Sequence, residues 1–250
     1  MKNSTAARAG RHGARAGAAV LLAAGSLAAF VAPVTAAPSC AVPAGVTPMA
    51  PFPPPPSQVV TSATVSHYVL SLTWAPEWCR LNGSKPDAQT ECADHSRGFV
   101  VHGLWPTSDA KPYPRFCRTV GAIDPATFGT AWCLSPSAYL LQHEWEAHGS
   151  CSFPTPAAYF GEEAALVGAL TLPDLDRLPT PVGTAGDVRA AFTRLNPSLT
   201  QDMIAVQSDR KQRLGEVHVC YGLDFHPARC SHADYGAPNR VPIRVTPRAG

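Results

Sequence analysis

Residues 140–151 read LLQHEWEAHGSC, so two histidines and two glutamates fall within six positions and are followed by a glycine and a cysteine. If the stretch is helical, Glu144 and His148 lie four residues apart and share one face of the helix. A carboxylate beside an imidazole raises the proton affinity of the ring and orients it, which suits acid–base catalysis. The alternative interpretation is a solvated helix end.

This stretch does not match the zinc-protease motif His-Glu-x-x-His, in which the two histidines lie four residues apart. Here His148 follows His143 by five residues, and Ala147 occupies the intervening fourth position. On an ideal helix the two rings diverge by roughly 140°, so they do not chelate one ion without distortion. The sequence therefore predicts a site with no metal ion and no cofactor.

Residues 98–106, GFVVHGLWP, form a second candidate site. Val100 and Val101 favour a strand, and Pro106 ends it. His102 then lies near the end of the strand, Gly103 permits a close backbone approach, and Trp105 offers a ring face. The alternative is that His102 is a core histidine.

In the rest of the chain, on both sides of these two stretches, the pattern of apolar residues predicts an α+β domain. We expect strands at 66–74, 98–106, 203–206, 216–221 and 241–245, the last at a sheet edge, and helices at 135–148, 156–170 and 187–195. Ser135 is the expected N-cap of the first helix, and Gly149 its end. Strands and helices do not alternate regularly, which argues against a doubly wound parallel sheet. The segments 79–92 and 107–130 are expected to be loops.

The first 36 residues have the order of a secretory signal peptide. Basic residues without acids precede an apolar run at 18–31, and small residues at 34–37 follow it. A membrane anchor is the alternative, but the small residues and the lack of a later apolar span favour cleavage. We therefore expect a signal peptide at 1–36, a stiff proline-rich linker at 37–58 and one folded domain at 59–250. The mature protein should be secreted, without membrane attachment.

The charge that remains after cleavage is slightly acidic. Without the four basic residues of the first 36, 16 Lys and Arg stand against 18 Asp and Glu. This balance excludes a protein that binds nucleic acid mainly through a broad basic surface.

All eight cysteines follow the expected signal peptide. An even number of cysteines in an exported chain predicts disulfides formed in an oxidising compartment. No Cys-x-x-Cys pair occurs, so neither a zinc ribbon nor a redox motif is indicated.

The blocks HGLWP at 102–106 and HEWEAHGSC at 143–151 together resemble the two active-site segments of the T2-type ribonuclease family. The upstream stretch YVLSLTW at 68–74 looks like the first strand of that family. The resemblance covers roughly residues 59–245 and implies an antiparallel sheet flanked by helices, in a ribonuclease catalytic domain stapled by disulfides.

By this resemblance the reaction is metal-independent transesterification of single-stranded RNA to a 2′,3′-cyclic phosphate. His148 would be the general base and His102 the general acid, while His143 would donate to the phosphate and Glu144 would stabilise charge. Trp105 and Tyr113 match family positions that sandwich a base, although core packing is the alternative for both. The need for a 2′-hydroxyl excludes DNA as a cleavable substrate, and we expect a monomer.

Three departures from the family pattern bear on activity. Ala147 stands where many members have a lysine, which would stabilise the charged phosphorane; Lys111, Arg115 and Arg118 are candidate substitutes. Thr107 replaces an acid or amide that often selects the base. Leu140 and Leu141 replace an aromatic pair.

For the disulfides, the resemblance implies the pairs Cys79–Cys92, Cys117–Cys151 and Cys220–Cys230, which leaves Cys40 with Cys133. The pairing Cys92–Cys133 with Cys40–Cys79 stays open.

Two rival functions remain. One is another secreted hydrolase, such as a metalloprotease or a histidine-dependent phosphatase. The other is a catalytically weak or inactive relative that binds RNA or a partner protein, an alternative that Ala147 keeps open. Because an unperturbed imidazole titrates near about 6.5, a two-histidine mechanism predicts a bell-shaped pH profile in the acidic range.

Overall fold

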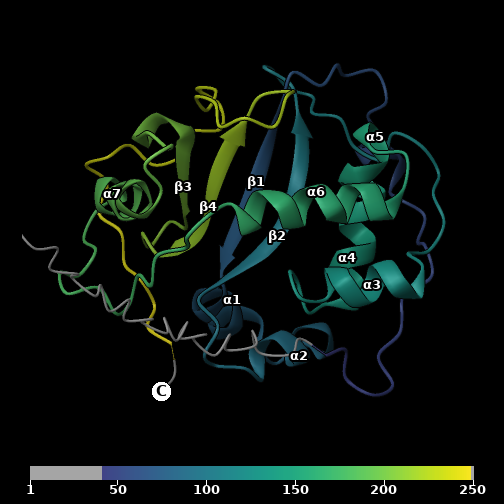
Figure 1. The fold of residues 1–250 in the computed structure, drawn as a ribbon, viewed down its shortest axis with the longest axis horizontal. Coiled ribbons are helices and arrows are strands. Elements are labelled where there is room, and N and C mark those ends of the chain that lie inside the picture. Colours follow the sequence, from purple (N-terminus) through teal and green to yellow (C-terminus); the bar gives the residue numbers. More distant parts are fainter. Residues whose placement is uncertain (1–40, 249–250) are drawn as a thin grey trace, which may run out of the picture. The chain divides into compact units, whose positions relative to one another are not determined.

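The computed structural model describes residues 41–248, apart from the side chain of Asp87. At the centre lies a sheet of four antiparallel strands in the order β2-β1-β4-β3 (Figure 1). The strands are β1 (His67–Trp74), β2 (Phe99–Thr107), β3 (Ile204–Ser208) and β4 (Leu214–Tyr221). The predicted α+β class with an antiparallel sheet is confirmed, whereas the expected signal peptide at 1–36 lies outside the described residues.

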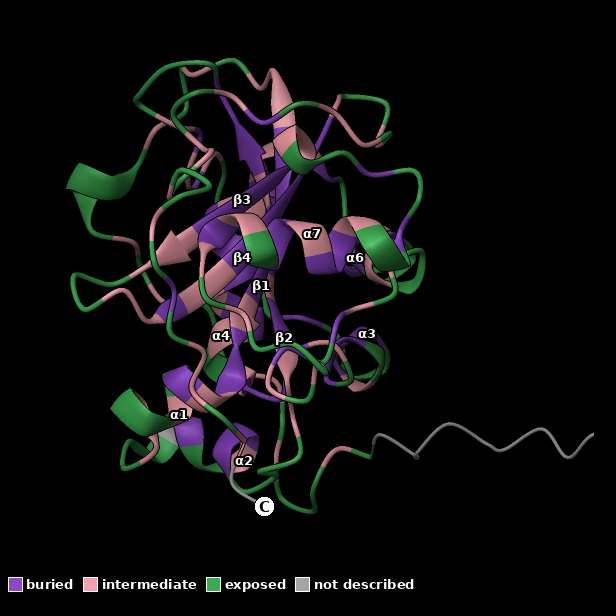
Figure 2. Cartoon of the chain, turned by 90° about the vertical axis from the view of Figure 1, so that its left-hand side faces the viewer, coloured by how far each residue is buried: buried purple, intermediate pink, exposed green. Residues whose placement is uncertain are grey.

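One face of the sheet forms the hydrophobic core. Successive side chains of a strand point to opposite faces, and on this face Leu70, Leu72, Leu104 and Val217 are fully buried (Figure 2). Two helices cover it, α6 (Pro156–Gly168) and α7 (Ala185–Leu195), and contribute buried aromatic side chains to the same core (Figure 1). Both helices agree with the sequence pattern.

The opposite face of the sheet carries the polar groups. Trp105 of β2 and Cys220 of β4 both lie beside Val69 of β1 in the strand register, and His218 of β4 lies beside Ser71. This face is where the candidate site forms.

Three short helices occur where the sequence predicted loops: α1 (Ala75–Asn82), α2 (Gln89–Cys92) and α3 (Pro125–Ala131). Proline lies in the first turn of both α1 and α3, where its missing N–H costs nothing. Asp124 caps α3, since its side chain accepts from the main-chain N–H of Ala126 and Thr127. Short 3₁₀ turns are η1 (Pro56–Gln58), η2 (Pro86–Ala88) and η4 (Gln201–Met203). Within residues 41–248, no helix is both long and apolar enough to cross a membrane.

The helix that carries His143 differs from its prediction at both ends. It begins as α4 (Ala138–Glu144), and its N-cap is Ser137, whose Oγ accepts from the N–H of Leu140 at 3.2 Å, instead of Ser135. It does not stop at Gly149, but continues as a π-helical turn, η3 (Trp145–Gly149), and as α5 (Ser150–Ser152). The Ser150 hydroxyl donates to the Glu146 carbonyl at 2.7 Å. This carbonyl of the π-helical turn therefore has a hydrogen-bond partner.

The predicted edge strand at 241–245 is wrong. Pro242 has no N–H to donate to a ladder, and this segment makes only isolated bridges, from Pro242 to Thr184 and from Arg244 to Arg213.

The proline-rich segment packs on the domain, contrary to the expectation of a linker that stays apart from the core. Val42 and Val46 pack against the main hydrophobic core, and the N–H of Phe52 donates to Glu146 Oε1 at 3.2 Å. The prolines keep the segment extended, and the apolar side chains between them find partners on the domain.

Three predicted disulfides are present, Cys79–Cys92, Cys117–Cys151 and Cys220–Cys230. The first of them excludes the alternative pairing of Cys92 with Cys133. The expected Cys40–Cys133 bridge involves Cys40, which lies outside the described residues.

Replacing both Cys117 and Cys151 by alanine is expected to lower the free energy of unfolding by about 2–4 kcal/mol, since this bridge closes a long loop; its sequence separation is 34 residues. RNA cleavage, the activity that the family resemblance implies, should fall as well, because the bridge ties the loop after β2 to the end of the helix that carries His143 and His148. Denaturant unfolding and RNA cleavage by the same preparation measure both effects. The Cys79→Ala, Cys92→Ala variant is the control for stability; equal activity loss in both variants would contradict a special role for the 117–151 bridge.

Candidate active site

The two histidine stretches meet in one cavity, which we call the histidine cavity. Its volume is about 460 Å³, within the range of small-molecule binding sites. All six predicted site residues line it: His102, Trp105, Tyr113, His143, Glu144 and His148. The other lining residues are Val69, Pro106, Thr107, Lys111, Pro114, Arg115, Gln207, His218, Ala233 and Asp234.

A β-bulge in β2 positions His102. In the pairing of β1 with β2, Ser71 lies opposite Gly103 and Leu72 lies opposite Val101, so His102 is the extra residue. A bulge interrupts the regular alternation of side chains and re-aims one of them, here into the cavity.

Two carboxylates hold the His102 ring. Its Nδ1 lies 2.6 Å from Glu216 Oε1 on β4, and its Nε2 lies 3.6 Å from Glu144 Oε1. Burial lowers the pKa of His102, but the hydrogen bond to Glu216 and the negative charges of Glu144 and Glu216 outweigh burial and raise the pKa to about 9. His102 is therefore protonated at neutral pH.

Glu144 is a buried carboxylate between two histidines. Its Oε2 accepts from Trp105 Nε1 at 2.8 Å and lies 3.9 Å from His148 Nε2. Burial raises the pKa of Glu144 to about 7, although the charge of His102 and the Trp105 bond act in the opposite direction. A Cβ at position 103 would overlap Glu144 Oε2, so Gly103 is needed for this packing.

His148 and His143 differ from His102 because both are held neutral. Burial lowers the pKa of His148 well below its usual value, and the positive charges of Arg115 and His102 add to the effect. Burial also lowers the pKa of His143 to about 4, with contributions from Arg115 and His102. Their ring centroids are 6.5 Å apart with an interplanar angle of 82°. The cavity thus combines a protonated imidazole with two neutral ones.

The proline-rich segment forms part of the surroundings of His143. The Phe52 ring is parallel to the His143 ring, with centroids 6.2 Å apart and 9° between planes. Tyr139 of α4 stacks on both, at 5.3 Å from Phe52 and 6.0 Å from His143. Phe52 therefore shields one side of a proposed catalytic ring from water.

Replacing Phe52 by alanine is expected to raise the pKa of His143 from about 4 towards the ordinary imidazole value of about 6.5, because burial is the largest cause of its lowering. Proton NMR titration of the histidine ring resonances measures this shift. Met49→Ala, at a partly exposed position in the same segment, is the control. An unchanged His143 titration in the Phe52 variant would mean that the segment does not shield the ring.

Arg115 is a candidate substitute whose positive charge acts on both His143 and His148, since it lowers their pKa values. Its main chain pairs with that of Val60, and the next N–H, of Phe116, donates to the carbonyl of Ala147 at 2.9 Å. Arg115 Nε is buried and has no hydrogen-bond partner among the described residues. Lys111 also lines the cavity. Arg118 instead donates to the carbonyl of Phe153 and stacks on Trp145.

Two residues of β4 belong to the site and were missed as functional residues in the sequence. Glu216 bonds His102 as described, and its Oε2 accepts from the Ser71 hydroxyl at 3.2 Å and lies 2.9 Å from His218 Nε2. His218 also lines the cavity. The signal was present in the alternation of residues 216–221, which places Glu216 and His218 on one strand face.

Among residues 41–248, no three His, Cys, Asp or Glu side chains are grouped as ligands of a metal ion.

Residues 65–177 match the model of the Ribonuclease T2 family. This stretch is similar to that family. The match spans the two histidine blocks, α4 and η3, and therefore all six predicted site residues.

Two ribonucleases are similar to part of this chain. A probable ribonuclease of Haemophilus influenzae is 36% identical over 124 residues, which are 45% of this chain and 46% of that protein. A ribonuclease of Aeromonas hydrophila is 42% identical over 86 residues, 34% of this chain and 37% of that protein. The chain therefore matches less than half the length of either relative.

The fold has solved counterparts. The crystal structure of RNase NT in complex with 5′-AMP superposes with a TM-score of 0.56 and 17% sequence identity, over 74% of this chain and 99% of that one. At this identity the likeness concerns the fold alone.

Proposed function

We propose that the protein is a secreted endoribonuclease that cleaves single-stranded RNA by transesterification through a 2′,3′-cyclic phosphate. The observation that carries the proposal is the pair of imidazoles on either side of Glu144, of which His102 is protonated and His148 neutral at neutral pH. Transesterification needs one group that accepts a proton and one that donates it.

In this mechanism neutral His148 removes the proton of the ribose 2′-hydroxyl, and the oxygen attacks the adjacent phosphorus. Protonated His102 donates to the departing 5′-oxygen. His143, neutral but still carrying one N–H, donates to a phosphate oxygen. Glu144 stabilises the positive charge that develops on His148, and Trp105 and Tyr113 stack on a base, at about 1–3 kcal/mol for each stacked base.

Arg115 takes the place of the cation that is missing at Ala147. A guanidinium in the cavity stabilises the negative charge of the phosphorane through charge-assisted hydrogen bonds, and the unpartnered Nε of Arg115 has such a donor to offer.

Replacing Arg115 by alanine is expected to lower kcat about tenfold, the typical loss for one charge-assisted hydrogen bond. Arg118→Ala, which removes a cation outside the cavity, is the control. The measurement is the single-turnover rate of oligonucleotide cleavage. If Arg118→Ala slowed cleavage and Arg115→Ala did not, Arg118 instead of Arg115 would be the cation that stabilises the phosphorane.

The proposed function is tested with mature, disulfide-intact protein on a single-stranded RNA oligonucleotide in excess EDTA. Mass spectrometry of the products should detect new 3′ ends carrying a 2′,3′-cyclic phosphate, and a DNA oligonucleotide of the same sequence should stay intact. Binding of RNA without cleavage would instead favour the alternative, a non-catalytic relative that binds RNA. Cleavage that EDTA abolishes would contradict the metal-independent mechanism.

A further inference from the structure

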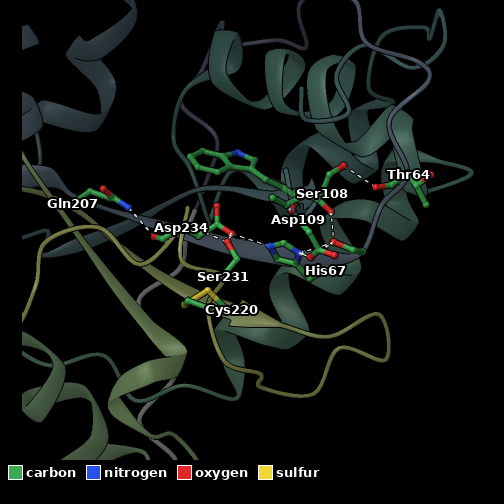
Figure 3. Close-up of polar contacts among 12 residues, drawn as sticks. Thr64, His67, Ser108, Asp109, Gln207, Cys220, Ser231 and Asp234 are labelled. Carbon is green, nitrogen blue, oxygen red and sulfur yellow. Dashed lines mark hydrogen bonds and ion pairs between the residues drawn. A yellow bond between two sulfur atoms is a disulfide. The ribbon is translucent and has the colours of Figure 1, made fainter. Parts of the chain in front are cut away.

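The histidine cavity contains a carboxylate that the proposed reaction does not use, that of Asp234. Its side chain is only 11% exposed. His67 Nε2 bonds Asp234 Oδ2 at 2.8 Å, and the Ser231 hydroxyl donates to the same oxygen at 2.5 Å (Figure 3). Both hydrogen bonds that described residues make to this carboxylate use Oδ2, which leaves Oδ1 for another donor.

The segment that carries Asp234 is anchored on both sides. Before it, Cys230 is bonded to Cys220 of β4. After it, the fully buried Arg189 donates to the carbonyl of Tyr235 at 2.9 Å and lies over the Tyr235 ring at 3.9 Å. Gln207 Nε2 donates to the carbonyl of Asp234 itself at 3.1 Å (Figure 3). The carboxylate is thus held in place before any ligand arrives, which is the condition for selective recognition.

Asp234 lines the same cavity as the proposed base-binding side chains Trp105 and Tyr113. His67, which holds the carboxylate, lies directly opposite Thr107 in the pairing of β1 with β2. The Thr107 hydroxyl donates to the carbonyl of Trp105 at 3.0 Å, so its proton is not available to a base. Tyr113 lines the same cavity as Asp234, and its pKa is raised first by burial and then by the negative charge of Asp234.

We propose that Asp234 selects the base that stacks on Trp105 and Tyr113, and that it favours bases with an amino group over uracil. The proposal rests on the proposed ribonuclease function. A carboxylate only accepts hydrogen bonds, and the amino groups of adenine, cytosine and guanine are donors. The single ring N–H of uracil lies between two carbonyl oxygens, which a carboxylate repels.

The test uses four DNA oligonucleotides that each contain one ribonucleotide, A, C, G or U, so that only one bond has a neighbouring 2′-hydroxyl. The wild-type protein is expected to cleave at A, C and G with kcat/KM about tenfold higher than at U, the usual effect of one hydrogen bond to a charged group. Asp234→Asn removes the charge and offers an amide donor, so the ratio of kcat/KM at A, C or G to kcat/KM at U should fall towards one.

Asp109→Asn is the matched control. Asp109 is exposed, lies 3.6 Å from His67 Nδ1 in the same polar cluster (Figure 3), and does not line the cavity. The Asp109→Asn substitution removes one negative charge beside the same histidine, His67, and should leave the base preference unchanged. A wild-type preference for uracil, or the same ratios in Asp234→Asn as in the wild type, would overturn the proposal.

Binding of CMP and UMP, measured by calorimetry, separates this proposal from the proposed function. Tighter binding of CMP that is lost in Asp234→Asn supports recognition by Asp234 even if no RNA is cleaved, in which case only the catalytic proposal fails. Equal binding of CMP and UMP by the wild type, with or without cleavage, overturns the role of Asp234. Wild-type measurements alone decide this point if the variant does not fold.

Discussion

His148→Ala is expected to lower kcat for RNA cleavage by about 10²–10⁴-fold, the usual contribution of a general base, and to change stability little. The His148 side chain is 13% exposed at the cavity wall, and its Nδ1 has no hydrogen-bond partner among the described residues, so its removal breaks no strong contact. Single-turnover cleavage and thermal melting measure the two effects.

His95→Ala is the control for His148→Ala, because His95 is exposed and does not line the histidine cavity. It should keep full activity. If His148→Ala cleaved RNA within threefold of the wild-type rate, the general base would be another group, and His143 would be the next residue to replace.

Glu216→Gln is expected to restrict activity to lower pH. The general acid must be protonated, so kcat/KM falls as pH rises through the pKa of His102, about 9. Glutamine keeps a hydrogen-bonding group but lacks the negative charge that offsets burial, and such a charge shifts a pKa by about 1–3 units. The alkaline limb should move down by that amount, with a loss of about two- to ninetyfold at pH 8 and of at most about twofold below pH 6.

The pH profile of kcat/KM on a short RNA measures this shift. Glu162→Gln on α6 removes the same charge from a residue that does not line the cavity, and its profile should match the wild type. An alkaline limb that stays near pH 9 in Glu216→Gln would show that Glu216 does not keep His102 protonated. The wild-type profile should itself extend beyond the acidic range expected for unperturbed imidazoles.

The side chains that line the histidine cavity on β2 and α4–η3 were predictable as a group because their signals are local. The spacing of His143, Glu144 and His148 and the block around His102 lie in short stretches, and strand alternation identified β1, β2 and β4. The three disulfides followed from the family resemblance. Helices α1 and α3 were not predicted from the sequence, although the prolines in their first turns, Pro76 and Pro125, are well tolerated at that position.

The groups that tune the site were not predictable, because they come from distant parts of the chain. Glu216 meets His102 across 114 positions, and Asp234 meets His67 across 167. Such contacts depend on which strands become neighbours and on the bulge at His102, neither of which has a local sequence signal. Phe52 was missed for a related reason, since proline-rich composition predicts an extended backbone and says nothing about what its aromatic side chain touches.

The π-helical turn η3 bears on how this protein can change over evolution. Its extra residue sets the rotation between His143 and His148, so the chemistry depends on the number of residues in the turn as well as on their identity. Loss of one residue between 145 and 147 would convert the π-helical turn into an ordinary α-helical one, in which successive residues are rotated by about 100°. His148 would then follow Glu144 by three residues instead of four, and its ring would face Glu144 differently. We therefore expect this turn to accept substitutions, such as alanine at position 147, more readily than insertions or deletions.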